Sequence, residues 1–228
     1  MTIPAATGPR QARRILRQPD FMRPAFEICY ITDRHALEPQ PLLPFIVEAV
    51  RAGVDLLQIR EKDLATRELL ELVKGAVSAA EGTTTRVVVN DRLDVALAAG
   101  AAGVHLGTRS LPAAVVRRQV SRGFLVGVSC HALEEVAEAE QAGADYVVLG
   151  PIFETPSKLA YGPPLGLEKL REVAARVKIP LLALGGINVE RVATCLQAGA
   201  TGIAGISVFQ SCASLAERVR DLRTQFAR

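Results

Sequence analysis

The chain has 228 residues, of which 49% are hydrophobic and 22% are charged. This length and composition predict one globular domain with a sizeable core, and no apolar run approaches the roughly 20 residues of a membrane-spanning helix. The net charge of +3 is uneven, because residues 1–25 hold five arginines and one acid, a net of +4, which leaves +3 minus 4, or −1, for the rest. A near-neutral body gives no support for nucleic-acid binding. We expect neither a membrane nor a nucleic acid as a partner.

The basic segment 1–25 lacks the apolar core of a secretory signal. We interpret it as a flexible or loosely docked N-terminal extension, and we expect the folded domain over residues 26–228. The cysteines are scattered, without metal-binding or CxxC spacing, which predicts free thiols in a reducing cytoplasm. These cysteines are Cys29, Cys130, Cys195 and Cys212.

Apolar strands and amphipathic helices alternate from residue 27 onwards. The strand at 27–32 precedes the helix Leu42–Ala52, and the strand at 54–60 follows it directly. The next pair is the helix Glu68–Ala80 and the strand Arg86–Asn90. The chain begins as a series of strand–helix units.

The second half of the chain repeats one pattern: a helix end, the pair Gly-Ala, and a buried strand that closes in glycine. The copies are Ala99–Gly107, Ala142–Gly150 and Ala198–Gly205, with a looser one at Ala52–Gln58. Each first glycine suits the left-handed position that ends a helix. The strand candidates are 28–32, 54–60, 86–90, 103–106, 124–129, 145–149, 180–184 and 201–206. Strands buried on both faces and alternating with helices, the last of them at Ser214–Phe226, predict a single-domain α/β fold, a (β/α)8 TIM barrel. A doubly wound open sheet is the alternative, but it rarely needs eight evenly spaced units.

In such a barrel, chemistry belongs at the carboxyl ends of the strands. Polar residues follow the strands at these points: Gln58, Arg60, Lys62, Asn90, Asp91, Ser129 and His131. Asp91 suits either a divalent cation or the cap of the helix that begins near Arg92. His131 suits either catalysis or a hydrogen bond to a neighbour, and we interpret His105 as a structural core residue.

Three loops supply groups that bind anions. The loop from Gly150 to Gly166 carries Thr155, Ser157 and Lys158, two hydroxyl groups and an ammonium group. Gly185-Gly186 and Gly205-Ile206-Ser207 follow the last two strands, where barrels commonly bind phosphate with backbone N–H groups. The sequence therefore predicts a small phosphate or diphosphate as substrate.

The motifs QIREK, ND, GVHLG, GVSCH, GADYVVLGPIFETPSK, ALGGI and GATGIAGIS occur in this order over about residues 26–226. In this order they resemble thiamine-phosphate synthase and its relative, the TenI-type thiazole tautomerase. The resemblance implies a transferase of thiamine biosynthesis, which joins hydroxymethylpyrimidine diphosphate to thiazole phosphate and releases diphosphate. The implied reaction is dissociative: diphosphate leaves with Mg²⁺, and the thiazole nitrogen captures a pyrimidine cation.

The resemblance also implies roles for the residues that match these motifs. Those that would meet the pyrimidine diphosphate are Gln58, Arg60, Lys62 and Asn90, with Asp91 as the Mg²⁺ ligand and Ser129 near the pyrimidine. Those that would hold the thiazole phosphate and the leaving diphosphate are Thr155, Ser157, Lys158, Gly186, Ile206 and Ser207. The residues expected to take part in catalysis are Ser129, Lys158 and, in the tautomerase, His131.

One position departs from the family pattern. The synthases usually have a second acidic Mg²⁺ ligand where this chain has Ser110, next to Arg109. A serine hydroxyl is a poor Mg²⁺ ligand and a nearby guanidinium disfavours the ion, which makes the Mg²⁺ cofactor doubtful. We expect Arg109 to contact the diphosphate directly.

Two alternatives to the synthase stay open. The tautomerase needs no Mg²⁺ and would use His131 as a general acid and base on a thiazole carboxylate phosphate. A non-catalytic barrel would bind phosphates of the thiamine pathway without turnover. The oligomeric state also stays open, and barrels of this kind often form homodimers.

Overall fold

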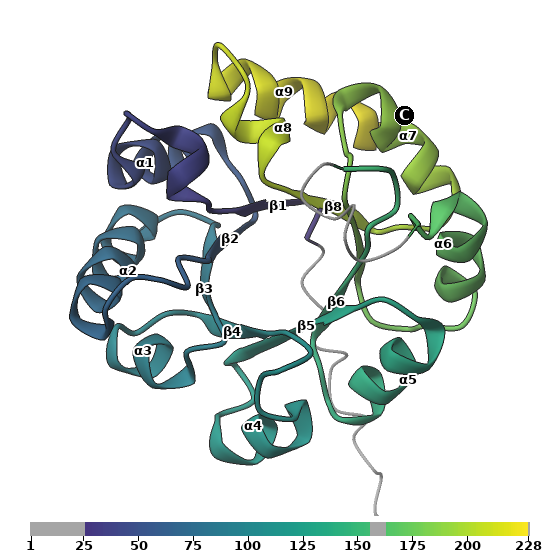
Figure 1. Ribbon diagram of the computed structural model, residues 1–228, viewed down its shortest axis with the longest axis horizontal. Coiled ribbons are helices and arrows are strands. Elements are labelled where there is room, and N and C mark those ends of the chain that lie inside the picture. The colour runs from purple at the N-terminus through teal and green to yellow at the C-terminus, as the bar shows by residue number, and fades with distance from the viewer. Residues whose placement is uncertain (1–25, 156–162, 228) are drawn as a thin grey trace, which may run out of the picture.

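Eight parallel strands close into a barrel in the order β1 to β8, and helices surround it (Figure 1). The structure, a computed structural model, describes residues 26–155 and 163–227. The extension at 1–25 and the candidate residues Ser157 and Lys158 lie outside the described residues. The predicted (β/α)8 barrel is confirmed.

The strands lie close to their predicted positions. They are β1 (Ile28–Ile31), β2 (Leu56–Ile59), β3 (Arg86–Asn90), β4 (Gly103–Leu106), β5 (Leu125–Cys130), β6 (Tyr146–Leu149), β7 (Leu181–Leu184) and β8 (Gly202–Gly205). Each strand pairs with the next one along the chain, and β8 pairs with β1.

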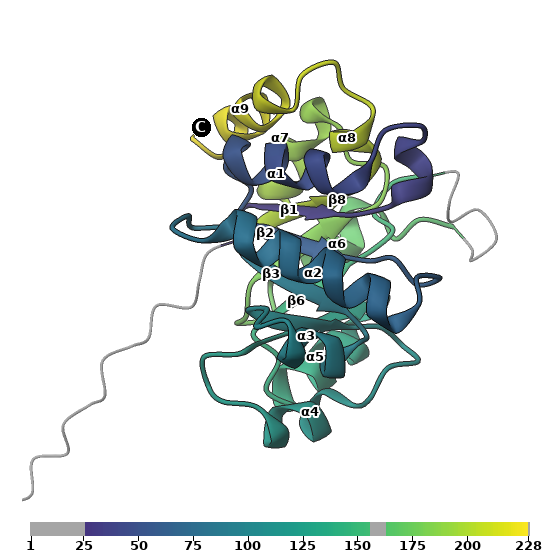
Figure 2. The same ribbon diagram turned by 90° about the vertical axis from the view of Figure 1, so that its left-hand side faces the viewer.

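The helices cover the outside of the barrel, and α1 and α2 lie in front of the strands in Figure 2. They are α1 (Leu42–Ala52), α2 (Thr66–Ala80), α3 (Leu93–Ala98), α4 (Ala113–Gln119), α5 (Leu133–Gln141), α6 (Gly166–Ala174), α7 (Val189–Gln197), α8 (Ser207–Gln210) and α9 (Leu215–Phe226), with a 3-10 helix, η1 (Arg34–Leu37). The prediction for α1 is confirmed at both ends, and α2 begins two residues earlier than predicted. We did not predict the short η1 and α8. No helix in the described ranges is long and apolar enough to cross a membrane.

Glycine ends the helices where the repeats predict it. Gly53 has φ 88° and donates its N–H to the carbonyl oxygen of Val50 at 3.0 Å. Gly199 has φ 96°, and a Cβ atom there would lie 2.6 Å from Cβ of Ala174 on α6. Only glycine suits a left-handed position with so little space, and this lets each strand start directly behind its helix.

The core has two layers because successive side chains of a strand point to opposite faces. Inward-facing residues fill the barrel: Phe26, Cys29, Ile31, Leu56, Val88, Tyr146, Val148, Leu182 and Ala204. Outward-facing residues such as Leu57 and Val87 pack in the layer that contains Ile46 of α1 and Val73 of α2. Full burial of such a side chain contributes roughly 1.5–3 kcal/mol, so the two layers stabilise the barrel that holds the site.

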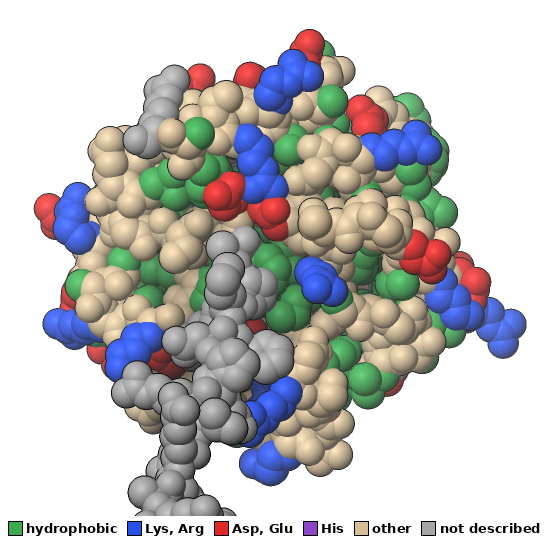
Figure 3. Space-filling model, turned by 180° about the vertical axis from the view of Figure 1, so that it is seen from behind, with side chains coloured by type: hydrophobic (Ala, Val, Ile, Leu, Met, Phe, Trp, Pro, Cys, Tyr) green, Lys and Arg blue, Asp and Glu red, His purple; other side chains and the backbone are tan. Residues whose placement is uncertain are grey.

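Ion pairs close the end of the barrel where the strands begin. Asp55 accepts hydrogen bonds from the backbone N–H groups of Glu27 and Ile28, at 3.0 and 2.8 Å, and pairs with Arg223 of α9. Arg223 also pairs with Glu27. Figure 3 shows this face, on which basic and acidic side chains are interspersed. These contacts join the last helix to the first strands.

Gly127 of β5 makes room for the ring of Tyr146 on β6. The two residues are register partners, and a Cβ atom at Gly127 would lie 2.1 Å from Cζ and 2.3 Å from the hydroxyl oxygen of Tyr146. The absence of a side chain at Gly127 therefore allows a tyrosine to lie across the barrel interior.

We expect Gly127→Ala to lower the free energy of unfolding by about 3 kcal/mol, since overpacking a core typically costs about 1–3 kcal/mol. Chemical denaturation measures the effect. The control is Gly123→Ala, where a Cβ atom meets nothing within 4 Å, and its effect should stay within about 0.5 kcal/mol. Equal stabilities of the two variants would show that the space at Gly127 is not required.

Candidate active site

A layer of polar side chains lies inside the barrel near the carboxyl ends of four consecutive strands. It consists of Gln58 (β2), Asn90 (β3), His105 (β4) and Ser129 (β5). Gln58 and Asn90 lie two positions beyond the inward-facing Leu56 and Val88, so the strand alternation turns them inward as well. The structure brings these four residues of distant sequence to the same end of the barrel, where hydrogen bonds join Asn90 to His105 and His105 to Ser129.

Two atoms of this layer have no hydrogen-bond partner. Gln58 is 2% exposed, and its Nε2 atom is buried without a partner. Asn90 donates from Nδ2 to the backbone oxygen of His105 at 3.3 Å, but its Oδ1 atom is buried and unpaired. Within the described residues only one further buried side-chain atom, Oε1 of Gln210, is unpaired. An unsatisfied buried polar group costs about 1–3 kcal/mol. A polar ligand that forms hydrogen bonds with these two atoms would remove this cost.

His105 lies at the centre of the layer and is 1% exposed. Its Nδ1 atom is 3.0 Å from the hydroxyl oxygen of Tyr146, and its Nε2 atom is 2.8 Å from Oγ of Ser129. Burial, together with the positive charge of Arg60, lowers the pKa of His105 to about 3. The prediction that His105 is a buried core residue is confirmed. We did not predict its contact with Ser129. The alternation of side chains along β4, which begins at Gly103, already indicated that His105 points into the barrel.

The segment after β2 carries the two cationic candidates, Arg60 and Lys62, on either side of a buried acid, Glu61. Glu61 is 4% exposed. It accepts hydrogen bonds from Oγ1 of Thr32 at 2.6 Å and from the backbone N–H and Nη1 of Arg34, both at 3.2 Å. Thr32 in turn accepts the backbone N–H of Arg60 at 2.9 Å. The buried acid therefore holds the backbone that presents the cations.

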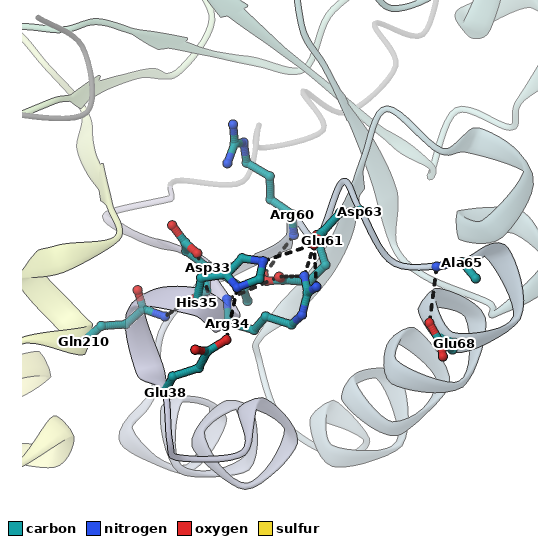
Figure 4. A network of polar contacts seen from close by, with 11 residues as sticks. Asp33, Arg34, His35, Glu38, Arg60, Glu61, Asp63, Ala65, Glu68 and Gln210 are labelled. Carbon is teal, nitrogen blue, oxygen red and sulfur yellow. Dashed lines mark hydrogen bonds and ion pairs between the residues drawn. The ribbon is translucent and has the colours of Figure 1, made fainter.

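The guanidinium of Arg60 extends away from this network (Figure 4). No hydrogen bond or ion pair joins that guanidinium to another described residue, and its charge acts on His105. Arg60 is therefore a cation available to a ligand beside the polar layer.

A cluster on η1 stabilises the same segment. Arg34 forms a two-pronged ion pair with Asp63, and His35 lies 3.0 Å from Asp63 and 3.1 Å from Glu38. Arg34, and after it His35, lowers the pKa of Asp63, while Asp63 and then Glu38 raise the pKa of His35. Sequence analysis missed this cluster, because its members are 28 or 29 residues apart and no local pattern joins them.

Gln210 of α8 connects the cluster to the segment that follows β8, the strand next to β1. Its Nε2 atom donates to the hydroxyl of Tyr30 at 3.1 Å and to the backbone oxygen of Asp33 at 2.9 Å. Figure 4 shows Gln210 reaching toward η1 from α8. Hydrogen bonds through η1 thus connect the segment that carries Arg60 with α8.

Asp91 does not cap a helix. Helix α3 begins at Leu93 with Arg92 at its N-cap and no side-chain cap bond. Asp91 has φ 65°, the only positive φ of a non-glycine residue in the described ranges, and its N–H donates to the backbone oxygen of His105 at 2.8 Å. A residue held in this conformation costs of order 1–3 kcal/mol, and such residues cluster at functional sites. The structure therefore rules out the helix cap, and a cation site at Asp91 stays a prediction.

The loop after β4 provides no second carboxylate. Oγ of Ser110 accepts the backbone N–H of Gly107 at 2.8 Å, so this hydroxyl is engaged within its own turn. No cluster of three potential metal-binding side chains exists among residues 26–155 and 163–227. Asp91 alone would hold a Mg²⁺ ion here, and the ion would take its other ligands from water and substrate oxygens, as Mg²⁺ commonly does. Arg109 is exposed beside Ser110.

The glycine loops after β7 and β8 leave the barrel side by side, because Leu184 pairs with Ala204. Gly185 and Gly186 have φ 100° and 62°, and a Cβ atom at Gly185 would lie 2.6 Å from Pro151. After β8, Ile206 is the N-cap of α8 and Ser207 its first residue. Backbone N–H groups at such loops bind phosphate because glycine allows close approach.

The loop after β6 packs against this glycine pair. Ile152 and Phe153 donate their N–H groups to the backbone oxygens of Leu184 and Gly185, at 2.7 and 3.1 Å. Arg191 covers the ring of Phe153 at 4.6 Å and donates to the backbone oxygen of Gly186 at 2.6 Å. The described start of the loop that carries Thr155 therefore runs beside the glycine pair.

His131 lies apart from the polar layer. Its Nδ1 atom is 2.5 Å from the backbone oxygen of Gly150, and its backbone N–H donates to Oε2 of Glu135 at 2.6 Å. Since a carbonyl oxygen only accepts, Nδ1 carries the proton in this contact. The sequence left open whether His131 bonds to a neighbour, and the structure shows such a bond.

A closed parallel barrel with polar side chains inside it and glycine loops after its last two strands defines a class: (β/α)8 barrels, whose sites lie at the carboxyl ends of the strands. The protein-family model described as thiamine monophosphate synthase matches residues 28–209. The chain belongs to the thiamine monophosphate synthase family.

Individual relatives agree. The chain is 44% identical to the thiamine-phosphate synthase of Methanoculleus marisnigri over 182 residues, 78% of this chain and 85% of the relative. It is 37% identical to that of Syntrophomonas wolfei over 198 residues, 87% and 95% of the two chains. The solved thiamine phosphate pyrophosphorylase of Pyrococcus furiosus is similar with a TM-score of 0.80 and 35% identity, over 90% of this chain and 97% of that one.

The pKa values of the buried His105 and the exposed His35 should be shifted in opposite directions from the ordinary value of 6.5. We expect NMR spectra of His105 to keep the neutral form from pH 8 to pH 5, because its pKa is about 3, while His35 titrates above 6.5. Below 6.5 the unfolded chain binds a proton at His105 that the folded chain does not. This group therefore lowers the free energy of unfolding as the pH falls from 6.5 toward 3. His105→Gln assigns the signal, and a midpoint of His105 near 6.5 would contradict the burial that we describe.

Proposed function

We propose that the chain is a thiamine-phosphate synthase, a transferase of thiamine biosynthesis that joins hydroxymethylpyrimidine diphosphate to thiazole phosphate and releases diphosphate. One observation carries the proposal: the unpaired amide atoms of Gln58 and Asn90 lie in a buried layer beside the available guanidinium of Arg60. A polar ring with an anionic leaving group satisfies all three at once. The names of the related synthases support it.

Each part of the site has a role in this reaction. Gln58 and Asn90 would bind the pyrimidine through the atoms that lack partners. Arg60 and Lys62 would hold the diphosphate, since fixed cations stabilise a leaving anion most as its charge develops. The thiazole phosphate would bind to the glycine loops and the loop beside them, through Thr155, Ser157, Lys158, Gly186, Ile206 and Ser207.

Charge on the departing diphosphate would come from two sources. Mg²⁺ held by Asp91 would supply positive charge to the diphosphate when bound. Arg109 is exposed next to Ser110. Its guanidinium would supply positive charge to the diphosphate at the point where the site lacks a second carboxylate to hold the metal. The reaction would take place in the cytoplasm, where the free thiols stay reduced, and a homodimer stays a prediction.

The decisive assay combines the purified chain with both substrates and Mg²⁺ and detects thiamine phosphate by mass. We expect turnover, and we expect Arg60→Ala to lower kcat/KM by about 100-fold, as removal of a preorganised charge at a reacting group does. Arg122→Ala is the control, an exposed arginine just before β5. Isomerisation of thiazole carboxylate phosphate that requires His131 would indicate the tautomerase instead. Phosphate ligands that raise the melting temperature without either product would indicate a binding protein.

Arg109→Ala should make turnover more dependent on Mg²⁺ than in the parent chain, because the variant loses the fixed charge. Without Mg²⁺, calorimetry should show diphosphate bound about tenfold more weakly by Arg109→Ala, the scale of one charge-assisted hydrogen bond. Arg109→Lys keeps the charge and should retain most of the affinity. An equally steep Mg²⁺ requirement in the parent and in Arg109→Ala would refute this role.

A further inference from the structure

Three side chains from neighbouring strands form a hydrogen-bonded chain across the barrel interior. Tyr146 of β6 contacts Nδ1 of His105 on β4 at 3.0 Å, and Nε2 of His105 contacts Oγ of Ser129 on β5 at 2.8 Å. Tyr146 is fully buried and His105 is 1% exposed. The missing side chain at Gly127 provides the room for the tyrosine ring. In such a chain, the donor and acceptor of one hydrogen bond determine the donor and acceptor of the next.

The protons in this chain have one consistent arrangement. Burial raises the pKa of Tyr146, so its hydroxyl keeps a proton to donate. Burial also keeps the ring of His105 neutral, with one N–H group and one acceptor nitrogen. In the described part of the chain, the hydroxyl of Tyr146 has no hydrogen-bond partner besides Nδ1 of His105. Tyr146 therefore donates to Nδ1, and the proton of His105 resides on Nε2.

The opposite tautomer carries a penalty. With the proton of His105 on Nδ1, the hydroxyl oxygen of Tyr146 would accept, and its own proton would be buried without an acceptor. An unsatisfied buried donor costs about 1–3 kcal/mol. The surroundings of Tyr146 thus decide the tautomer of His105, which in turn decides the direction of the bond to Ser129.

The consequence reaches the substrate site. Because Nε2 of His105 donates to Oγ of Ser129, the serine oxygen accepts and the serine proton is left for another partner. Ser129 is half-buried in the same layer as the unpaired atoms of Gln58 and Asn90. We propose that Tyr146 and His105 are positioning residues that make the Ser129 hydroxyl a hydrogen-bond donor toward an acceptor nitrogen of the substrate ring. The site would then select a ring with a lone pair at this position over one with an N–H group.

This inference rests on the proposed function for the identity of the ring, and a double-mutant cycle tests it. Tyr146→Phe keeps the aromatic ring and removes only the donor, which frees His105 to change tautomer. We expect Tyr146→Phe and Ser129→Ala each to lower kcat/KM by about tenfold, the scale of one hydrogen bond. The double variant should be no worse than Ser129→Ala alone, because Tyr146 acts through Ser129. Losses that multiply would overturn the proposal.

Tyr30→Phe provides the matched control. Tyr30 is also fully buried, and its hydroxyl accepts from Gln210 rather than belonging to this chain. Whatever its size, the effect of Tyr30→Phe should multiply with that of Ser129→Ala. If the loss of any buried tyrosine hydroxyl had the same general effect, the cycles of Tyr146→Phe and of Tyr30→Phe with Ser129→Ala would give the same coupling. This outcome would also count against the proposal.

The tautomer of His105 is a readout that does not depend on activity. Nitrogen-15 NMR should show the proton on Nε2 in the parent chain and a shift toward the Nδ1 tautomer in Tyr146→Phe, with His105→Gln to assign the signal. A parent chain with its proton on Nδ1 would overturn the proposal even if the enzyme turns over normally. Absence of synthase turnover together with the expected tautomers would instead count against the proposed function alone.

Discussion

Closure of the parallel barrel is the constraint on which the site depends. A closed sheet turns every second side chain of each strand into an enclosed interior, where polar atoms must bond to one another or to a ligand. Leu56 and Val88 belong to an apolar cluster inside the barrel. Two positions further along the strands the side chains are polar, and two of their atoms have no protein partner. The candidate binding site is the part of the barrel interior where buried polar atoms of the protein lack hydrogen-bond partners.

The cations of the site depend on a support that takes no part in the chemistry. Glu61 is buried and receives hydrogen bonds from Thr32 and Arg34, which holds the backbone of Arg60. A guanidinium held at its base but unpaired at its end suits a ligand anion, because little ordering remains to be done when the ligand binds. The same segment joins through η1 to Gln210 on α8, so hydrogen bonds connect the loops that follow the neighbouring strands β8, β1 and β2.

The loop after β4 contributes no carboxylate to the barrel mouth. Ser110 uses its hydroxyl to close a turn with Gly107, and Asp91 is left as the carboxylate at this edge of the barrel mouth. A single carboxylate binds Mg²⁺ mainly with the help of substrate oxygens. Arg109, exposed at the neighbouring position, adds a fixed positive charge at this edge.

The sequence by itself determined the barrel, the strand ends and the glycine loops, since these depend on local periodicity and turn chemistry. The alternation of strands and helices and the glycine at each helix end sufficed for the fold and for candidates such as Gln58 and Asn90. Only the tertiary structure decided that His105 connects Tyr146 with Ser129, 41 and 24 residues away, and that His131 bonds to Gly150. Such contacts follow from the register of neighbouring strands and from barrel closure, which no local pattern records.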